Sequence, residues 1–79
     1  MQKSVQGDHA GALQDVDRAI ELQPRAASHF VVRAGIHEKL GDLDACIADY
    51  KKAIELQPAL EPGLRRQLEH LEAKSSPGR

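Results

Sequence analysis

The feature that most constrains this chain is an internal repeat with a period of 34 residues. Residues 7–24 and 41–58 are identical at nine of eighteen aligned positions, and both segments end in the run Ala-Ile-Glu-Leu-Gln-Pro. Six consecutive identities do not easily arise by chance in a chain of 79 residues. A fixed period of this length is typical of repeat architectures, in which each unit buries its apolar face against its neighbours.

Each copy of the repeat carries the local signals of a helix with defined ends. In the second copy, Gly41 can adopt the left-handed conformation that ends the preceding helix. Asp42 can then cap the next helix, and Pro58 ends that helix because the residue before a proline avoids the α region. Between these signals apolar residues recur at helical spacing, at Leu43, Cys46, Ile47, Tyr50, Ala53 and Ile54.

Two further segments have helical spacing, one before Gly41 and one after Pro58, where leucines stand at positions 64, 68 and 71. The sequence therefore predicts an all-α chain of antiparallel helix-turn-helix units. The four helices are expected near residues 8–22, 26–40, 43–56 and 62–73, with boundaries good to about three residues.

The pattern resembles the tetratricopeptide repeat, which has this period and Gly-Asp between its two helices. The family's small residues correspond to Ala12, Cys46, Ala19 and Ala53, its large apolar position to Val16 and Tyr50, and its closing proline to Pro24 and Pro58. On the first helix Phe30 stands where the family has tryptophan, and Ala34 where it has a small residue. The chain departs from the family at Arg33, usually leucine, and His37, usually tyrosine.

The resemblance implies a fragment of an α-solenoid over residues 1–74. It comprises the second helix of a partial repeat at 7–24, a complete repeat at 25–58 and a helix at 61–73 that resembles the family's capping helix. Residues 75–79 are expected to form a disordered tail, since they have no apolar content. Ala53 is expected to be buried where two helices approach closely.

Composition excludes several function classes. Eleven basic and twelve acidic residues give a net charge of −1, and Phe30 and Tyr50 are the only aromatic residues, so neither a basic stripe nor a base-stacking platform for nucleic acid is expected. No apolar run approaches the ~20 residues of a membrane span, and the first seven residues lack a signal peptide. We expect a soluble, cytoplasmic protein.

No cofactor, metal site or enzymatic activity is expected. The single cysteine, Cys46, is interpreted as a small buried residue, and no pair of the four histidines has the one-turn spacing of helical zinc ligands. The carboxylates are expected on exposed helix faces or at helix caps, notably Asp15, Asp17, Asp42, Asp44 and Asp49.

The leading functional hypothesis is a module that binds a peptide or helix of a partner protein. By resemblance, the first helix of each unit lines a concave groove. The predicted partner-binding residues are Ser28, Val31, Val32, Gly35, Glu38 and Lys39, continued on the last helix by Arg65, Arg66 and Glu69. The two arginines could bind an acidic group.

Two alternatives are left open. A complete first unit would need about fourteen residues before Gly7 and the sequence has six, so the helix at 8–22 is expected to lack a partner helix. Self-association as a homodimer could cover that helix through Ala12, Leu13, Val16 and Ile20. The other alternative is a targeting module from a larger multidomain protein.

Overall fold

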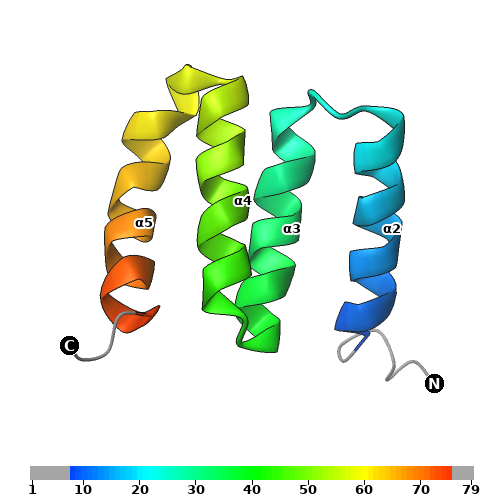
Figure 1. Cartoon of the computed structure of the whole chain (residues 1–79), viewed down its shortest axis with the longest axis horizontal. Coiled ribbons are helices and arrows are strands. Elements are labelled where there is room, and N and C mark those ends of the chain that lie inside the picture. The colour runs from blue at the N-terminus through cyan, green and yellow to red at the C-terminus, as the bar shows by residue number, and fades with distance from the viewer. Residues whose placement is uncertain (1–7, 76–79) are drawn as a thin grey trace.

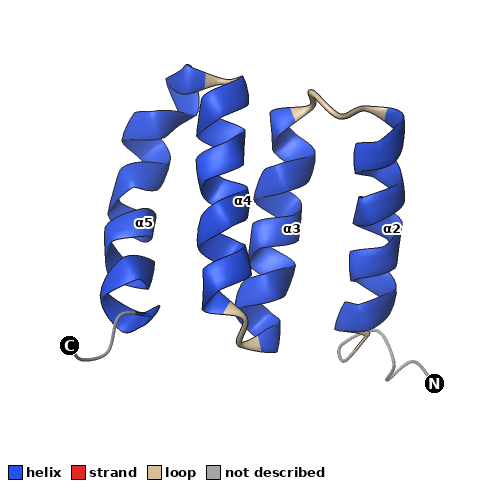
Figure 2. Ribbon diagram, viewed as in Figure 1, coloured by secondary structure: helices blue, strands red, loops and turns tan. Residues whose placement is uncertain are grey.

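The computed structural model describes residues 8–75, and this part of the chain contains helices and no strand. The elements in order are α2 (His9–Leu22), α3 (Ala27–Leu40), α4 (Leu43–Leu56), the short 3₁₀ helix η1 (Pro58–Leu60) and α5 (Glu61–Ser75). Successive α-helices run antiparallel and lie side by side (Figures 1 and 2). The expected all-α fold is confirmed, with each predicted helix end within two residues of the observed one.

The C-terminal end differs from the expectation. Helix α5 continues through Lys74 to Ser75, so residue 75 belongs to the helix and not to the expected tail. Residues 76–79, the rest of the expected tail, lie outside the described residues. The 3₁₀ turn at 58–60 was not predicted; it follows Pro58, whose fixed φ suits the first position of a helix.

The helix boundaries follow from the residues that suggested them. Gly41 has a φ of 84°, and its backbone N–H and that of Asp42 donate to the carbonyls of Glu38 and His37. These bonds satisfy carbonyls that the end of a helix leaves free. The Asp42 carboxylate accepts a hydrogen bond from the Ala45 N–H at 3.3 Å, and Asp8 caps α2 in the same way through the Gly11 N–H at 3.0 Å.

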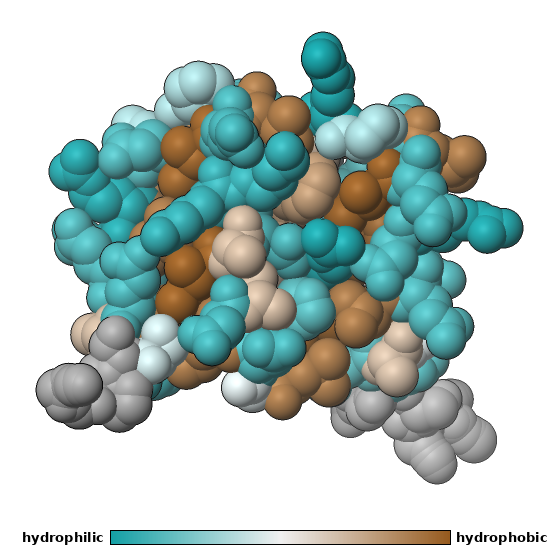
Figure 3. Space-filling view, viewed as in Figure 1, coloured by the Kyte–Doolittle hydropathy of each residue, from teal (hydrophilic) through white to brown (hydrophobic). Residues whose placement is uncertain are grey.

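The core lies between the helices and is built around small residues. One cluster joins α3, α4 and α5 through Ala34, Cys46, Ile47, Tyr50 and Leu71, and a second joins α3 and α4 through Ala27, Phe30 and Ala53. Ala53 and Cys46 are fully buried, as expected. On the face shown in Figure 3, hydrophobic side chains gather in bands between helices whose outer surfaces are mostly hydrophilic.

Candidate protein-interaction surfaces

The residues predicted to bind a partner lie on α3 and α5, and they differ in exposure. Val31 is only half-exposed because it packs against both core clusters, and Gly35 is also half-exposed. The others are exposed: Ser28, Val32, Glu38 and Lys39 on α3, and Arg65, Arg66 and Glu69 on α5. Val32, at 54% exposure, is the large apolar side chain that this set offers to a partner.

The two arginines of α5 differ in their contacts. Arg65 is engaged, since its Nε lies 3.2 Å from a carboxylate oxygen of Glu61 one turn earlier. Arg66 makes no ion pair within residues 8–75. It lines a shallow hollow of about 360 Å³ together with Gly63, Gln67 and His70. Of the two arginines of α5, Arg66 is therefore the one whose guanidinium is available to a ligand.

Gln67 and His70 were not predicted as site residues. They share one face of α5 with Gly63 and Arg66, since their spacing is that of successive helical turns. Nothing lies within 4 Å of the position that a Gly63 side chain would occupy. The Gln67 side-chain amide donates to the Tyr50 hydroxyl at 3.4 Å, which ties this face to α4. Gln67 and His70 follow Arg66 by one and four positions, and this helical spacing was the sequence signal that could have identified them.

The four residues predicted to mediate self-association do not form an uncovered face of α2. Val16 is buried at 6% exposure, and Ile20 packs against the cluster of Ala27, Phe30 and Ala53. Ala12 and Leu13 are half-exposed. The difference arises because α2 packs on α3, where Ile20 meets the cluster of Ala27, Phe30 and Ala53. Helical periodicity alone cannot say which apolar positions of α2 face that neighbour.

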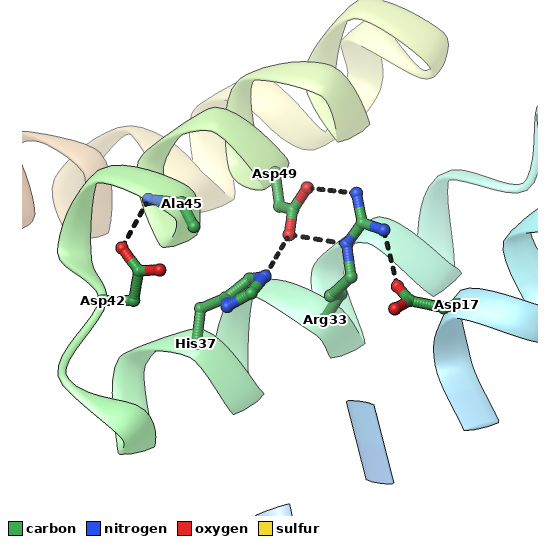
Figure 4. A network of polar contacts seen from close by, with 6 residues as sticks. All are labelled: Asp17, Arg33, His37, Asp42, Ala45 and Asp49. Atoms are coloured by element: carbon green, nitrogen blue, oxygen red, sulfur yellow. Dashed lines mark hydrogen bonds and ion pairs between the residues drawn. The ribbon is translucent and has the colours of Figure 1, made fainter. Parts of the chain in front are cut away.

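A polar network connects α2, α3 and α4 (Figure 4). Arg33 Nε and one terminal nitrogen donate to the two carboxylate oxygens of Asp49, both at 2.9 Å, and its other terminal nitrogen donates to Asp17 at 2.8 Å. Such a bidentate arrangement matches the planar fork of arginine to a carboxylate. His37 Nε2 lies 3.6 Å from the same Asp49 carboxylate.

The Asp49 carboxylate at the centre of this network is buried. Asp49 is 5% exposed, which overturns the expectation that it lies on an exposed face. The hydrogen bonds from Arg33 compensate for removing that carboxylate from water. The same hydrogen bonds, first to Asp49 and then to Asp17, raise the pKa of the Arg33 guanidinium further above its ordinary value against the opposing effect of burial. The guanidinium also lies 5.4 Å from the centre of the Phe30 ring.

The network explains both departures from the repeat pattern. The positions of Arg33 and His37 usually carry leucine and tyrosine, and here each contacts Asp49. His37 Nδ1 is buried without a hydrogen-bond partner in the described part of the chain. Arg33 and His37 thus make polar contacts between α3 and α4.

The described residues contain no group of three or more side chains that could hold a metal ion. None of their helices is long and apolar enough to cross a membrane. Burial raises the pKa of the Cys46 thiol to about 11. A thiol with so high a pKa is a poor nucleophile at neutral pH.

The architecture is that of a helical-repeat protein. The two copies of the repeated segment, α2 and α4, both pack against α3, which is the first helix of the complete repeat. Residues 30–60 match the family model of the tetratricopeptide repeat. The chain therefore carries a tetratricopeptide repeat, as the sequence pattern predicted, and such repeats generally mediate protein–protein interaction. The fold and the repeat together point to a non-catalytic interaction module.

Curated relatives give a second comparison. The chain is 33% identical over 63 residues to the protein SGT1 homolog of Bos taurus, a match that covers 80% of this chain and 19% of the relative. It is 37% identical over 51 residues to the Homo sapiens homolog and 40% over 50 residues to that of Oryza sativa subsp. japonica, covering 65% and 63% of this chain and 14% of each relative. The chain thus spans less than a fifth of the length of these relatives. No solved structure matches it.

Proposed function

We propose that this chain is a protein-binding module whose α3 and α5 surfaces hold an acidic segment of a partner protein. The observation that carries the proposal is the hollow on α5. Arg66, Gln67 and His70 bring a guanidinium, an amide and an imidazole to one face, and Gly63 leaves room beside them. Carboxylates are the complementary groups, because charge-assisted hydrogen bonds to arginine are the strongest available to such a surface.

Helix α3 would supply an apolar contact to the same partner. Val32 is 54% exposed, and Gly35 has nothing within 4 Å of the position of its missing Cβ. An exposed valine beside a glycine allows close approach of a partner backbone, since no side chain intervenes. A central apolar contact with a polar rim is the usual anatomy of a protein interface.

Partner binding is favoured over self-association as a homodimer. Pairing through α2 as first expected would need Val16 and Ile20, which already pack inside the chain. The module could equally serve within a longer protein, since the relatives it matches extend well beyond the shared segment.

The proposal is tested with fluorescent twelve-residue peptides, one series rich in aspartate and glutamate around a central leucine and one series with the corresponding amides. Fluorescence anisotropy should show binding of the acidic series only. Arg66→Glu should lower the affinity at least tenfold and flatten its dependence on salt, because a charge contact screened by ions is lost.

Arg65→Glu is the matched control. It makes the same charge change one residue away, at a side chain that faces Glu61 and does not line the hollow. It should therefore change affinity less than Arg66→Glu. Equal effects of the two substitutions, or equal binding of acidic and amide peptides, would show that the hollow does not recognise acidic groups.

A further inference from the structure

The hollow on α5 offers several hydrogen-bond donors and no acidic group. The residues that line it are Gly63, Arg66, Gln67 and His70, and the nearby Glu69 is not among them. Within residues 8–75 the Arg66 guanidinium makes no ion pair, and the exposed His70 ring makes neither a hydrogen bond nor an ion pair. An anion that enters the hollow therefore meets donors that no carboxylate of the described chain already occupies.

The helix places these donors close together. Arg66 and His70 are four residues apart, so they are neighbours on successive turns with about 5–6 Å between their Cβ atoms. Gln67 lies on the same face, and its amide donates to the hydroxyl of the buried Tyr50 at 3.4 Å. That bond uses one of the two amide hydrogens and holds the side chain in place, which leaves the other hydrogen for a ligand.

The set of donors exceeds what one carboxylate requires. An arginine binds both oxygens of a carboxylate with its planar fork, so Arg66 alone would satisfy that group. A phosphate monoester has three terminal oxygens and a charge of about −1.5 to −2 at pH 7. Its third oxygen can accept from the Gln67 amide and from the one N–H of a neutral His70 ring. Three donor side chains thus match a phosphate better than a carboxylate.

The shape of the hollow fits the same ligand. Its volume of about 360 Å³ is at the lower end of the ligand-pocket range of about 300–1,000 Å³. No atom lies within 4 Å of the position that a Gly63 Cβ would occupy, so the ligand can approach the helix closely there. Because the hollow is shallow, a short side chain such as phosphoserine or phosphothreonine fits it better than the long phosphotyrosine.

We infer that the α5 hollow binds a phosphorylated serine or threonine in the acidic segment of the partner protein, an inference that rests on the proposed function. Arg66 binds two phosphate oxygens, and Gln67 and His70 donate to the third. Phosphorylation of the partner then regulates its binding, since the added charge and oxygens strengthen hydrogen bonds that an unmodified serine cannot make.

The test uses the full chain and three fluorescent acidic peptides that differ at one position beside the central leucine, which is serine, phosphoserine or glutamate. Fluorescence anisotropy at pH 7.5 should show the phosphoserine peptide binding about tenfold more tightly than the glutamate peptide, the difference expected from one additional charge-assisted hydrogen bond. The serine peptide should bind more weakly than either.

Two substitutions in the hollow should have different effects. His70→Ala should lower the affinity for the phosphoserine peptide about tenfold and leave that for the glutamate peptide nearly unchanged, because Arg66 satisfies the carboxylate. Arg66→Ala should weaken both peptides. Arg65→Ala is the matched control, since it removes an exposed cation of the same helix outside the hollow and should leave the ratio of the two affinities unchanged.

The outcomes separate this inference from the function on which it rests. Equal binding of the phosphoserine and glutamate peptides, both weakened by Arg66→Ala, would overturn the inference and leave the recognition of acidic groups intact. A phosphoserine preference that His70→Ala does not reduce, or that Arg65→Ala reduces equally, would also overturn it. Absence of binding by all three peptides would overturn both.

Discussion

Arg33 on α3 donates two hydrogen bonds of 2.9 Å to the buried carboxylate of Asp49 on α4. It donates a third, of 2.8 Å, to Asp17 on α2. One side chain thus connects three consecutive helices, with each of its partners sixteen residues away in sequence. It does so at a position where the tetratricopeptide pattern usually has leucine, so a polar contact replaces an apolar one in this part of the structure.

The two partners in this contact are expected to differ in importance for stability. Arg33→Ala should lower the free energy of unfolding by about 3 kcal/mol, because it leaves the Asp49 carboxylate buried and unpaired. Asp49→Ala should cost less, about 1–2 kcal/mol, because Arg33 keeps Asp17 and some contact with water. Urea unfolding followed by circular dichroism measures both. A cost for Asp49→Ala as large as that for Arg33→Ala would contradict this account.

Close helix packing makes a prediction at Ala53, which is fully buried among Ala27 and Phe30. Ala53→Leu should destabilise the chain by about 1–3 kcal/mol, because the added atoms force the helices apart. Ala48→Leu, at an exposed position of the same helix, is the control and should change stability little. An unchanged thermal midpoint for Ala53→Leu would mean that α3 and α4 do not pack closely there.

Stability should fall in alkaline solution through Cys46. Burial raises the pKa of this thiol from 9.0 to about 11 in the folded chain. Between these two pH values the unfolded chain loses the proton and the folded chain keeps it, so the free energy of unfolding decreases as pH rises. The pKa of the Tyr50 hydroxyl is also raised, mainly by burial, which adds to the effect.

The measurement is urea unfolding from pH 8 to 11 for the parent and for Cys46→Ala. The substitution lowers stability at every pH but should make the decline between pH 9 and 11 shallower. Identical slopes for the two chains would show that the Cys46 thiol does not contribute to it.

Two glycines should respond in opposite ways to alanine. Gly41 ends α3 with a φ of 84°, a conformation that costs an L-residue about 1–2 kcal/mol, so Gly41→Ala should destabilise by about that amount. Gly35 lies within α3 with open space around the missing Cβ, so Gly35→Ala should stabilise by about 0.5–1 kcal/mol. Thermal denaturation distinguishes the two. A Gly41→Ala chain as stable as the parent would contradict the assignment of Gly41 as a helix end, and a destabilised Gly35→Ala chain would contradict the open space at Gly35.

The sequence by itself determined the four helices and most of their ends. The 34-residue period defined the units. The glycine and aspartate at the turns and the proline after the helices are local signals, because the hydrogen bonds at helix ends form within a few residues of chain. The burial of Ala53 and Cys46 was also expected from the sequence, because both stand where the tetratricopeptide pattern has small residues.

The polar contacts between helices were decided only by the tertiary structure. Asp15 and Asp49 occupy the same repeat position, yet Asp49 is buried against Arg33 while Asp15 is exposed. Likewise Arg65 and Arg66 are adjacent, yet Arg65 faces Glu61 and Arg66 lines the α5 hollow. Helical periodicity assigns a residue to a face, but its burial and partner depend on which other helix lies against that face, and that is fixed by the packing of the whole chain.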